Sequence, residues 1–269
     1  MKTQRTRAGF TLIELLVVIT IIAILAGLSG AAVQQVLKIG NQTKAVNNCR
    51  QVIMALKLFA GRNDTRFPDS VPNPLTGGVP QNANETFHML FQQGVARDER
   101  IFGAPAGYNP DGAIGTQPAY DRAVTPGENH WAMTAGLTDT SPGNMPLVYE
   151  NPAQPSWPPK WDASSPGQVK AGRVWSGNQI VIGRLDGGVE VVNLEGSGLS
   201  SPPKMVGGMD MFTQASEGQA MGILMPVLSA GNTRTDGMAP STPGRLPVPG
   251  GLPPIQSNLN PLQNELPVQ

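Results

Sequence analysis

An apolar run at residues 11–33 constrains this 269-residue chain more than any other feature, because Glu14 is its only ionisable side chain. As a helix rising about 1.5 Å per residue, the run would be roughly 34 Å long, enough to cross a hydrocarbon core of about 30 Å. Lys2, Arg5 and Arg7 precede the run, and the positive-inside rule places that end in the cytoplasm. The sequence therefore predicts a single-pass protein of the cytoplasmic membrane, with its bulk outside the cytoplasm.

Glu14 is the unusual residue of this run. A carboxylate in a membrane helix costs up to about 3 kcal/mol at the centre and less near the ends. One interpretation is that Glu14 lies close enough to the interface to reach water or to be protonated. The other is that assembly supplies a cationic partner, and cleavage between Gly9 and Phe10 would create one, the new α-amine of Phe10.

The basic leader at residues 1–9, the sequence FTLIE at residues 10–14 and the apolar run after it together resemble the N-terminus of type IV pilins and type II secretion pseudopilins. The resemblance covers little beyond the N-terminal helix. It implies that a prepilin peptidase cuts between Gly9 and Phe10 and that Phe10 is N-methylated. It also implies that Glu14 pairs with the Phe10 amine of a neighbouring subunit and sets the register of a helical filament.

An ordinary secretory signal peptide is the alternative for the same segment, with small residues at positions 29–32 offering a cleavage site. Two features count against it. Glu14 stands at the start of the apolar region, and that region is longer than the usual stretch of about 7–15 residues. The helical pattern also continues beyond the cleavage site.

Residues 34–61 keep helical periodicity while becoming more polar, with apolar side chains striping one face at Ile39, Val46, Cys49, Ile53, Leu56 and Ala60. We expect this amphipathic half to end near Gly61, which suits a C-terminal cap. Cys49 on the stripe is typical of a small buried hydrophobic residue. Residues 47–56, followed by Arg66-Phe67-Pro68, also resemble pseudopilin-type proteins common in planctomycete and verrucomicrobial bacteria.

A head is expected at residues 62–195, because every Trp and Tyr of the chain lies there. Asn84 is expected to cap a short helix that Gly94 ends. Two β-branched runs at 178–185 and 189–194, joined by Asp-Gly-Gly, predict a hairpin. Shorter strands are expected at 130–133, 146–150 and 172–175. These elements predict a small α+β head, an antiparallel sheet packed on the long helix.

Composition excludes several classes of function. The formal net charge is zero, so the chain lacks the basic excess of a nucleic-acid-binding protein. Cys49 is the single cysteine, which rules out an intrachain disulfide and a multi-cysteine metal site. No nucleophile-elbow, Walker A or dinucleotide-binding motif occurs, and His88 and His130 are interpreted as structural. The sequence thus predicts neither an enzyme nor a cofactor.

Some pseudopilins carry a calcium site, for which Asp111 and Asp186 would be the candidates here. Both aspartates are better explained as turn residues, so no metal is predicted. Asp98 and Glu99 are expected to form a solvated loop pair. The four tryptophans could line a sugar-binding surface, but core packing is the favoured interpretation.

The tail at residues 196–269 is rich in proline and glycine and is expected to be disordered, with a short helix or docking segment within 205–228. The predicted organisation is a leader (1–9), a transmembrane half-helix (10–33), an amphipathic half-helix (34–61), a head (62–195) and a tail (196–269). The predicted function is a pseudopilin-like subunit of a membrane-anchored fibre, partnered by a prepilin peptidase, other pilin-like subunits and lipid. The alternative is a membrane-tethered envelope or polysaccharide-binding protein that does not polymerise.

Overall fold

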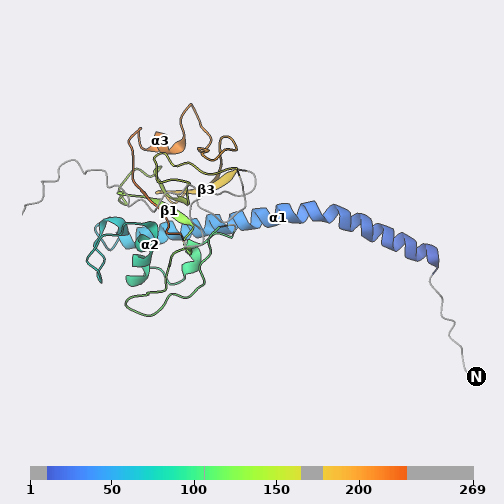
Figure 1. Ribbon diagram of the computed structural model, residues 1–269, viewed down its shortest axis with the longest axis horizontal. Coiled ribbons are helices and arrows are strands. Elements are labelled where there is room, and N and C mark those ends of the chain that lie inside the picture. Colours follow the sequence, from blue (N-terminus) through green and yellow to red (C-terminus); the bar gives the residue numbers. More distant parts are fainter. Residues whose placement is uncertain (1–10, 106, 165–177, 229–269) are drawn as a thin grey trace, which may run out of the picture.

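A single helix, α1, runs from Leu12 to Ala60, and its C-terminal half is part of the head while its N-terminal half projects from it (Figure 1). The computed structural model describes residues 11–105, 107–164 and 178–228. None of the helices in these ranges is both long and apolar enough to cross a membrane. The other elements are η1 (Pro68–Ser70), α2 (Ala83–Gln92), η2 (Glu99–Phe102), β1 (Trp131–Thr134), β2 (Pro146–Glu150), β3 (Gln179–Arg184), β4 (Val189–Asn193), α3 (Met211–Ala215) and β5 (Ile223–Leu224).

The predicted apolar stripe of α1 is buried only where the helix enters the head. Cys49, Ile53, Leu56 and Ala60 are completely buried. Ile39 was expected to share their environment, but it is 53% exposed, so that part of the prediction is wrong. The reason is position along the helix: burial begins near residue 45, one and a half turns beyond Ile39. The predicted end of the helix is confirmed.

The sheet has five antiparallel strands in the order β4-β3-β2-β1-β5 among the described residues. The expected hairpin is present as β3 and β4, and its turn has Gly187 at φ +90°. Asp186 accepts a hydrogen bond from the Gly188 N–H at 2.7 Å, as a turn residue does. Strands β1 and β2 also occur where they were expected, whereas the strand expected at 172–175 lies outside the described residues.

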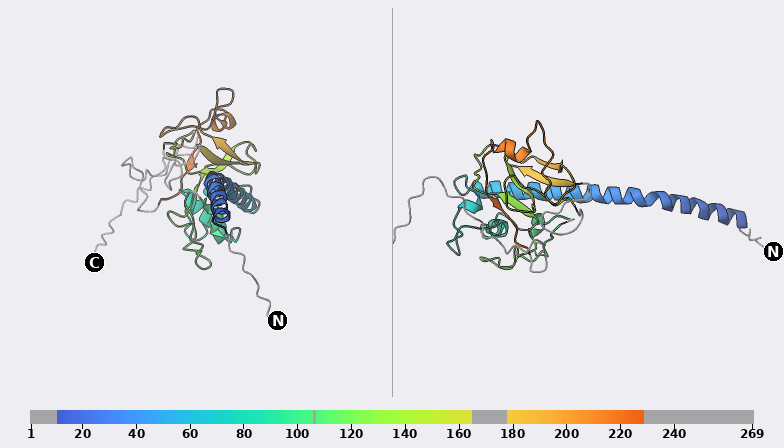
Figure 2. Two further views of the ribbon diagram at one scale, coloured as in Figure 1. Left: turned by 90° about the vertical axis from the view of Figure 1, so that its right-hand side faces the viewer. Right: turned by 45° about the horizontal axis from the view of Figure 1, so that its top comes forward.

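Side chains alternate across the sheet and so build two cores. One core lies between the sheet and α1, with α2 and η2 on the opposite side of the helix (Figure 2). The other covers the far face of the sheet, where the rings of Tyr149, Trp161 and Phe212 contact one another. Each fully buried aromatic or aliphatic side chain contributes roughly 1.5–3 kcal/mol. The head is therefore layered, with α1 inside it rather than beside it.

Gly183 in β3 allows the closest approach of α1 to the sheet. A Cβ at this position would lie 2.4 Å from Ile53 Cδ1 and 2.7 Å from Cys49 Sγ. The Cys49 Sγ lies 3.6 Å from the carbonyl oxygen of Val148 on β2. The helix thus contacts the sheet through the residues that were predicted to form its apolar stripe.

Helix α2 is the predicted short helix, but its cap is Asn82 rather than Asn84. The Asn82 side chain accepts a hydrogen bond from the Glu85 N–H at 2.9 Å. Asn84 is instead 6% exposed and donates to the carbonyl oxygens of Val124 and Thr125. The correction follows from burial: Asn84 faces the core of the head, where its amide group is the donor to the carbonyl oxygen of Val124.

The tail begins later than predicted, because part of the stretch after residue 195 belongs to the head. Asp210 caps α3, and Phe212 of that helix is completely buried. Strand β5 pairs with β1, with Met133 opposite Leu224. The predicted boundary at 195/196 is therefore wrong. The segment 205–228 has few apolar residues, but these pack into the two cores that the rest of the head forms. Residues 229–269 lie outside the described residues.

Candidate assembly and processing site

The first turn of α1 contains a reciprocal capping box between Thr11 and Glu14. The Thr11 N–H and hydroxyl group both donate to Glu14 Oε2, at 2.8 Å and 2.7 Å. In return the Glu14 N–H donates to Thr11 Oγ1 at 3.3 Å. These bonds satisfy donors that the helix leaves unpaired and place a carboxylate where the helix dipole favours it.

The capping role of Glu14 could have been predicted, because Thr-x-x-Glu is the sequence signature of a capping box. It adds a structural function to a residue that the sequence had singled out only as an assembly contact. Glu14 is exposed, so its carboxylate is accessible to another molecule. Gly9 and Phe10, the expected cleavage site, lie outside the described residues.

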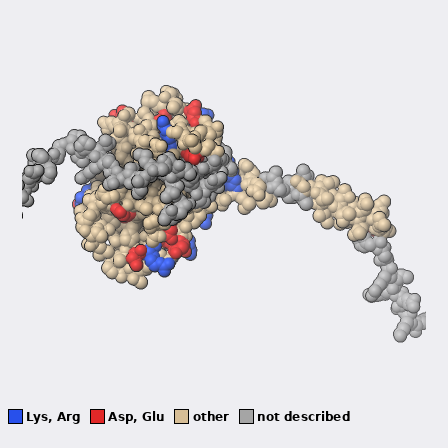
Figure 3. Space-filling view, viewed as in Figure 1, with Lys and Arg blue, Asp and Glu red and all other residues tan. Residues whose placement is uncertain are grey.

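The projecting part of α1 presents apolar side chains around the whole helix rather than along one face. The large apolar residues between positions 12 and 25 are between 46% and 83% exposed. Figure 3 shows this segment as an almost uncharged rod, whereas acidic and basic residues are scattered over the head. Such a surface requires an apolar environment or apolar neighbours, because water is a poor solvent for it.

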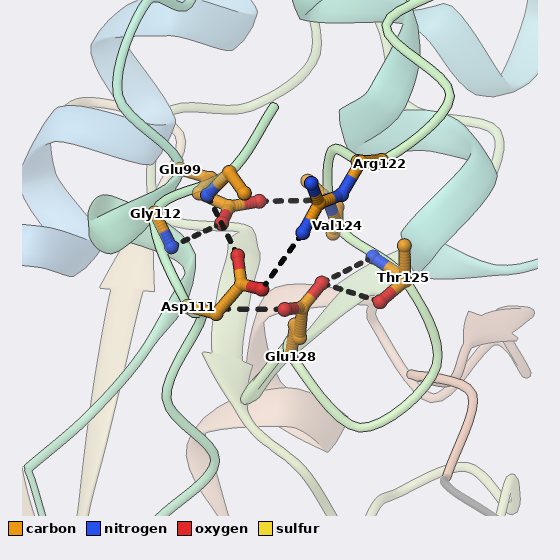
Figure 4. A network of polar contacts seen from close by, with 8 residues as sticks. Glu99, Asp111, Gly112, Arg122, Val124, Thr125 and Glu128 are labelled. Atoms are coloured by element: carbon orange, nitrogen blue, oxygen red, sulfur yellow. Dashed lines mark hydrogen bonds and ion pairs between the residues drawn. The ribbon is translucent and has the colours of Figure 1, made fainter. Parts of the chain in front are cut away.

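Within the described part of the head, Glu99, Asp111 and Glu128 form a cluster of carboxylates (Figure 4). Glu99 is completely buried, and it accepts hydrogen bonds from the N–H groups of Gly112 at 2.6 Å and Val124 at 3.1 Å. Burial raises the pKa of the Glu99 carboxyl; the two backbone donors partly oppose this. The expectation that Glu99 belongs to a solvated pair is therefore wrong.

Asp111 and Glu128 complete this network near the surface. Glu128 accepts from the N–H groups of Asp111 and Thr125, at 3.2 Å and 2.8 Å. Asp111 accepts from the Ala113 N–H at 2.6 Å and pairs with Arg122 at 3.5 Å. One oxygen from each of the three carboxylates lies within 4.8 Å of the others, a spacing that could hold a cation. Each carboxylate oxygen of the cluster nevertheless has a partner within the chain, so the cluster is accounted for as a cross-link of its loops.

The two histidines have structural environments, as the sequence indicated. His130 is 5% exposed; its Nδ1 accepts from the Tyr108 N–H at 3.4 Å, and its Nε2 lies 3.5 Å from a Glu150 carboxylate oxygen. His88 Nε2 lies 2.9 Å from the carbonyl oxygen of Tyr120. Neither ring contributes to the carboxylate cluster among the described residues.

The described tryptophans are core residues rather than a binding surface. Trp131 and Trp161 are completely buried, and their indole N–H groups donate to the carbonyl oxygens of Ile101 and Glu150, both at 3.0 Å. Trp157 is partly buried, with its ring edge-on to Phe212. Trp131 and Trp161 therefore present no open face on which a sugar could stack. Trp175 lies outside the described residues.

Cys49 is a buried side chain whose surroundings disfavour the thiolate. It is completely enclosed between α1 and the sheet. Burial raises the pKa of its thiol, and the carboxylate of Glu150 raises it further. A thiol in this environment is unreactive, which agrees with its predicted packing role.

Comparison with known proteins gives a match for one segment of the chain. Residues 4–30 match a family model described as a prokaryotic N-terminal methylation motif. The match includes Arg5 and Arg7 of the leader, the expected cleavage site and Glu14, and it supports a prepilin-type segment like that of type IV pilins and pseudopilins. It covers only a small part of the chain. Comparisons with curated proteins and with solved structures give no match.

Proposed function

We propose that this chain is a pseudopilin-like structural subunit of a membrane-anchored fibre, in a type II secretion system or a type IV pilus-like system. A prepilin peptidase cuts between Gly9 and Phe10, and Phe10 is then N-methylated. Glu14 pairs with the Phe10 amine of a neighbouring subunit. The chain itself catalyses nothing; its partners are the processing enzyme, other pilin-like subunits and membrane lipid.

One observation carries the proposal: the match to the methylation motif at residues 4–30 spans both the expected cleavage site and Glu14. The geometry of Glu14 is compatible with it. Both donors of Thr11 bind Oε2, so Oε1 is available to a cation from outside the chain. A charge-assisted hydrogen bond from an ammonium group is stronger than a hydrogen bond between neutral groups, and the difference is largest where water is excluded.

Single-pass membrane insertion is part of the same proposal, with the N-terminus in the cytoplasm and the head outside it. The apolar surface of α1 from Leu12 to Leu25 supports it, as do the three basic residues of the leader. The complete burial of Trp131 and Trp161 gives no support to a polysaccharide-binding tether.

Mass spectrometry of the mature N-terminus in the native host tests the processing step. We expect a chain that begins with N-methyl-Phe10. A chain that begins at Ala32 or Val33 would mean that the segment is a secretory signal peptide, and it would overturn the proposal.

Two substitutions separate the charge of Glu14 from its capping role. Glu14→Gln removes the charge but keeps an oxygen that accepts from Thr11, whereas Thr11→Ala removes the hydroxyl cap and keeps the charge. We expect Glu14→Gln to abolish cross-linking between subunits and Thr11→Ala to weaken it only partly. Methyl-Phe10 is measured in both variants, so that failed assembly is not confused with failed processing. Unchanged cross-linking in Glu14→Gln would favour a tether that does not polymerise.

A further inference from the structure

A groove of about 340 Å³ lies between one face of α2 and the loop at residues 73–80. Its loop side is lined by Asn73, Thr76, Gly78, Val79 and Pro80, and its helix side by Glu85, His88 and Gln92. Val79 is 41% exposed, and Leu75 on the same loop is 51% exposed. The head therefore presents an open groove with two apolar side chains, Val79 and Pro80, on its loop side and a carboxylate in its wall.

The described chain ends beside this groove. The Val227 N–H donates to Asn84 Oδ1 at 2.9 Å, and the carbonyl oxygen of Met225 accepts from the Ala83 N–H at 3.0 Å. Val227 also accepts from the Gly127 N–H at 2.8 Å through its carbonyl oxygen. These bonds fix the chain at the first turn of α2, one residue in sequence from Glu85 of the groove.

Residues 229–269 follow from this point and have ample length to reach the groove. Helix α2 has 10 residues and is about 15 Å long. An extended chain spans about 3.3 Å per residue, so even a few residues beyond position 228 could lie along the whole helix.

One stretch of this segment matches the groove in chemistry. Residues 245–249 read Arg-Leu-Pro-Val-Pro, which combines two apolar side chains, two prolines and a cation. Such a sequence favours an extended polyproline II conformation, so little conformational entropy is lost when it docks. The Glu85 carboxylate is held in place by Gln81 and Asn82, at 2.7 Å and 2.8 Å. It is therefore a fixed anion for the Arg245 guanidinium.

We propose that residues 245–249 dock in the groove of their own chain, with Leu246 and Val248 against Val79 and Arg245 paired with Glu85. The tail is then held on the end of the head farthest from the N-terminus of α1. This inference does not depend on the proposed function, because it concerns contacts within one chain.

Disulfide formation in the full-length chain tests the docking. The variant Val79→Cys/Val248→Cys places one thiol in the groove and one in the docking segment, and the buried Cys49 is inert. The control is Val79→Cys/Ser241→Cys, whose tail thiol is closer in sequence to residue 228. If the tail were only tethered and did not dock, the disulfide of the Ser241→Cys control would form at least as fast as that of the Val248→Cys variant, because a shorter loop gives a higher effective concentration of the two thiols. We expect the Val248→Cys pair to form about tenfold faster instead.

Two other results would overturn the proposal. One is an equal or faster rate for the Ser241→Cys control. The other is a disulfide between two chains whose yield rises with protein concentration, because this would place the tail in the groove of a neighbour.

A charge exchange tests the ion pair separately. Arg245→Glu should slow the Val79→Cys/Val248→Cys cross-link about two- to fivefold, as expected for an exposed pair, and a second change, Glu85→Arg, should restore the rate. Because Glu85 is exposed, replacing it does not disturb the core of the head, and a change in the cross-linking rate is not explained by loss of folding. If Glu85→Arg slows the reaction further instead of restoring it, the assigned orientation of the segment is wrong.

Discussion

Replacing Gly183 by alanine tests how α1 is joined to the sheet. The new methyl group would lie 2.4 Å from Ile53 Cδ1 and 2.7 Å from Cys49 Sγ, and 3.3 Å from the Val148 carbonyl oxygen. Overpacking of this kind costs about 1–3 kcal/mol, and the lower backbone entropy of alanine offsets roughly 0.5–1 kcal/mol of that. We expect a net loss of about 1–2 kcal/mol, which lowers Tm by about 2–8 °C in a chain of this size.

Thermal and urea unfolding of the full chain in detergent, followed by tryptophan fluorescence, measures this loss. Gly40→Ala is a matched control, because a Cβ there meets nothing within 4 Å and alanine favours the helix. It should leave the head unchanged or stabilise the chain by up to about 1 kcal/mol.

A double mutant decides whether the clash is the cause. Ile53→Val removes the atom nearest to the new methyl group and costs about 1 kcal/mol by itself. With Gly183→Ala it should give a loss smaller than the sum of the two by about 1 kcal/mol. Additive losses, or a Gly183→Ala variant as stable as the parent, would refute the close approach of helix and sheet.

Three further experiments test the head. Burial raises the pKa of Glu99 above its ordinary value of 4.5, so this carboxyl contributes stability that is present in acid and lost as the pH rises through its folded pKa. In urea titrations, Glu99→Gln should therefore flatten the fall of the free energy of unfolding with pH above pH 4.5. An unchanged slope would contradict the burial of Glu99. Asn84→Ala should cost about 3 kcal/mol and Asn82→Ala about 1 kcal/mol, since the first removes the side-chain partner of the Val124 carbonyl and of the Val227 N–H, and the second removes a helix cap; the opposite order in urea unfolding would argue against these assignments. Maleimide should label Cys49 far more slowly in the folded chain than in urea, and rapid labelling of the folded chain would show that the helix–sheet interface opens.

Local patterns were sufficient to predict much of this fold. The periodicity of α1, the Asp-Gly-Gly turn and the β-branched runs beside it each specify an element through short-range chemistry, and the structure has those elements at nearly the predicted residues. The apolar core stripe was also predictable as far as Cys49 and Ile53. Its end at Ile39 was not, because burial depends on where the head begins, and this is decided by distant segments of the chain.

The misassigned residues share one physical cause. Asn84, Glu99 and Phe212 each have side chains whose environment is formed by partners far away in sequence. A local reading assigns such residues by their type, as a cap, a solvated acid or part of a tail. At the candidate site the sequence identified Glu14 from its unusual position, while its bond to Thr11 followed from a local pattern that applies to any helix.

The unbroken course of α1 has a mechanical consequence. At about 1.5 Å per residue its 49 residues make a rod about 74 Å long, and the last turns of this rod lie inside the core of the head. No linker separates the projecting part from the globular part, so a torque applied to one end is transmitted to the other without a joint to absorb it. A neighbour that rotates or pulls the N-terminal half would therefore reorient the whole head as a rigid lever, and the contacts of α1 with the sheet and with η2 would transmit the force.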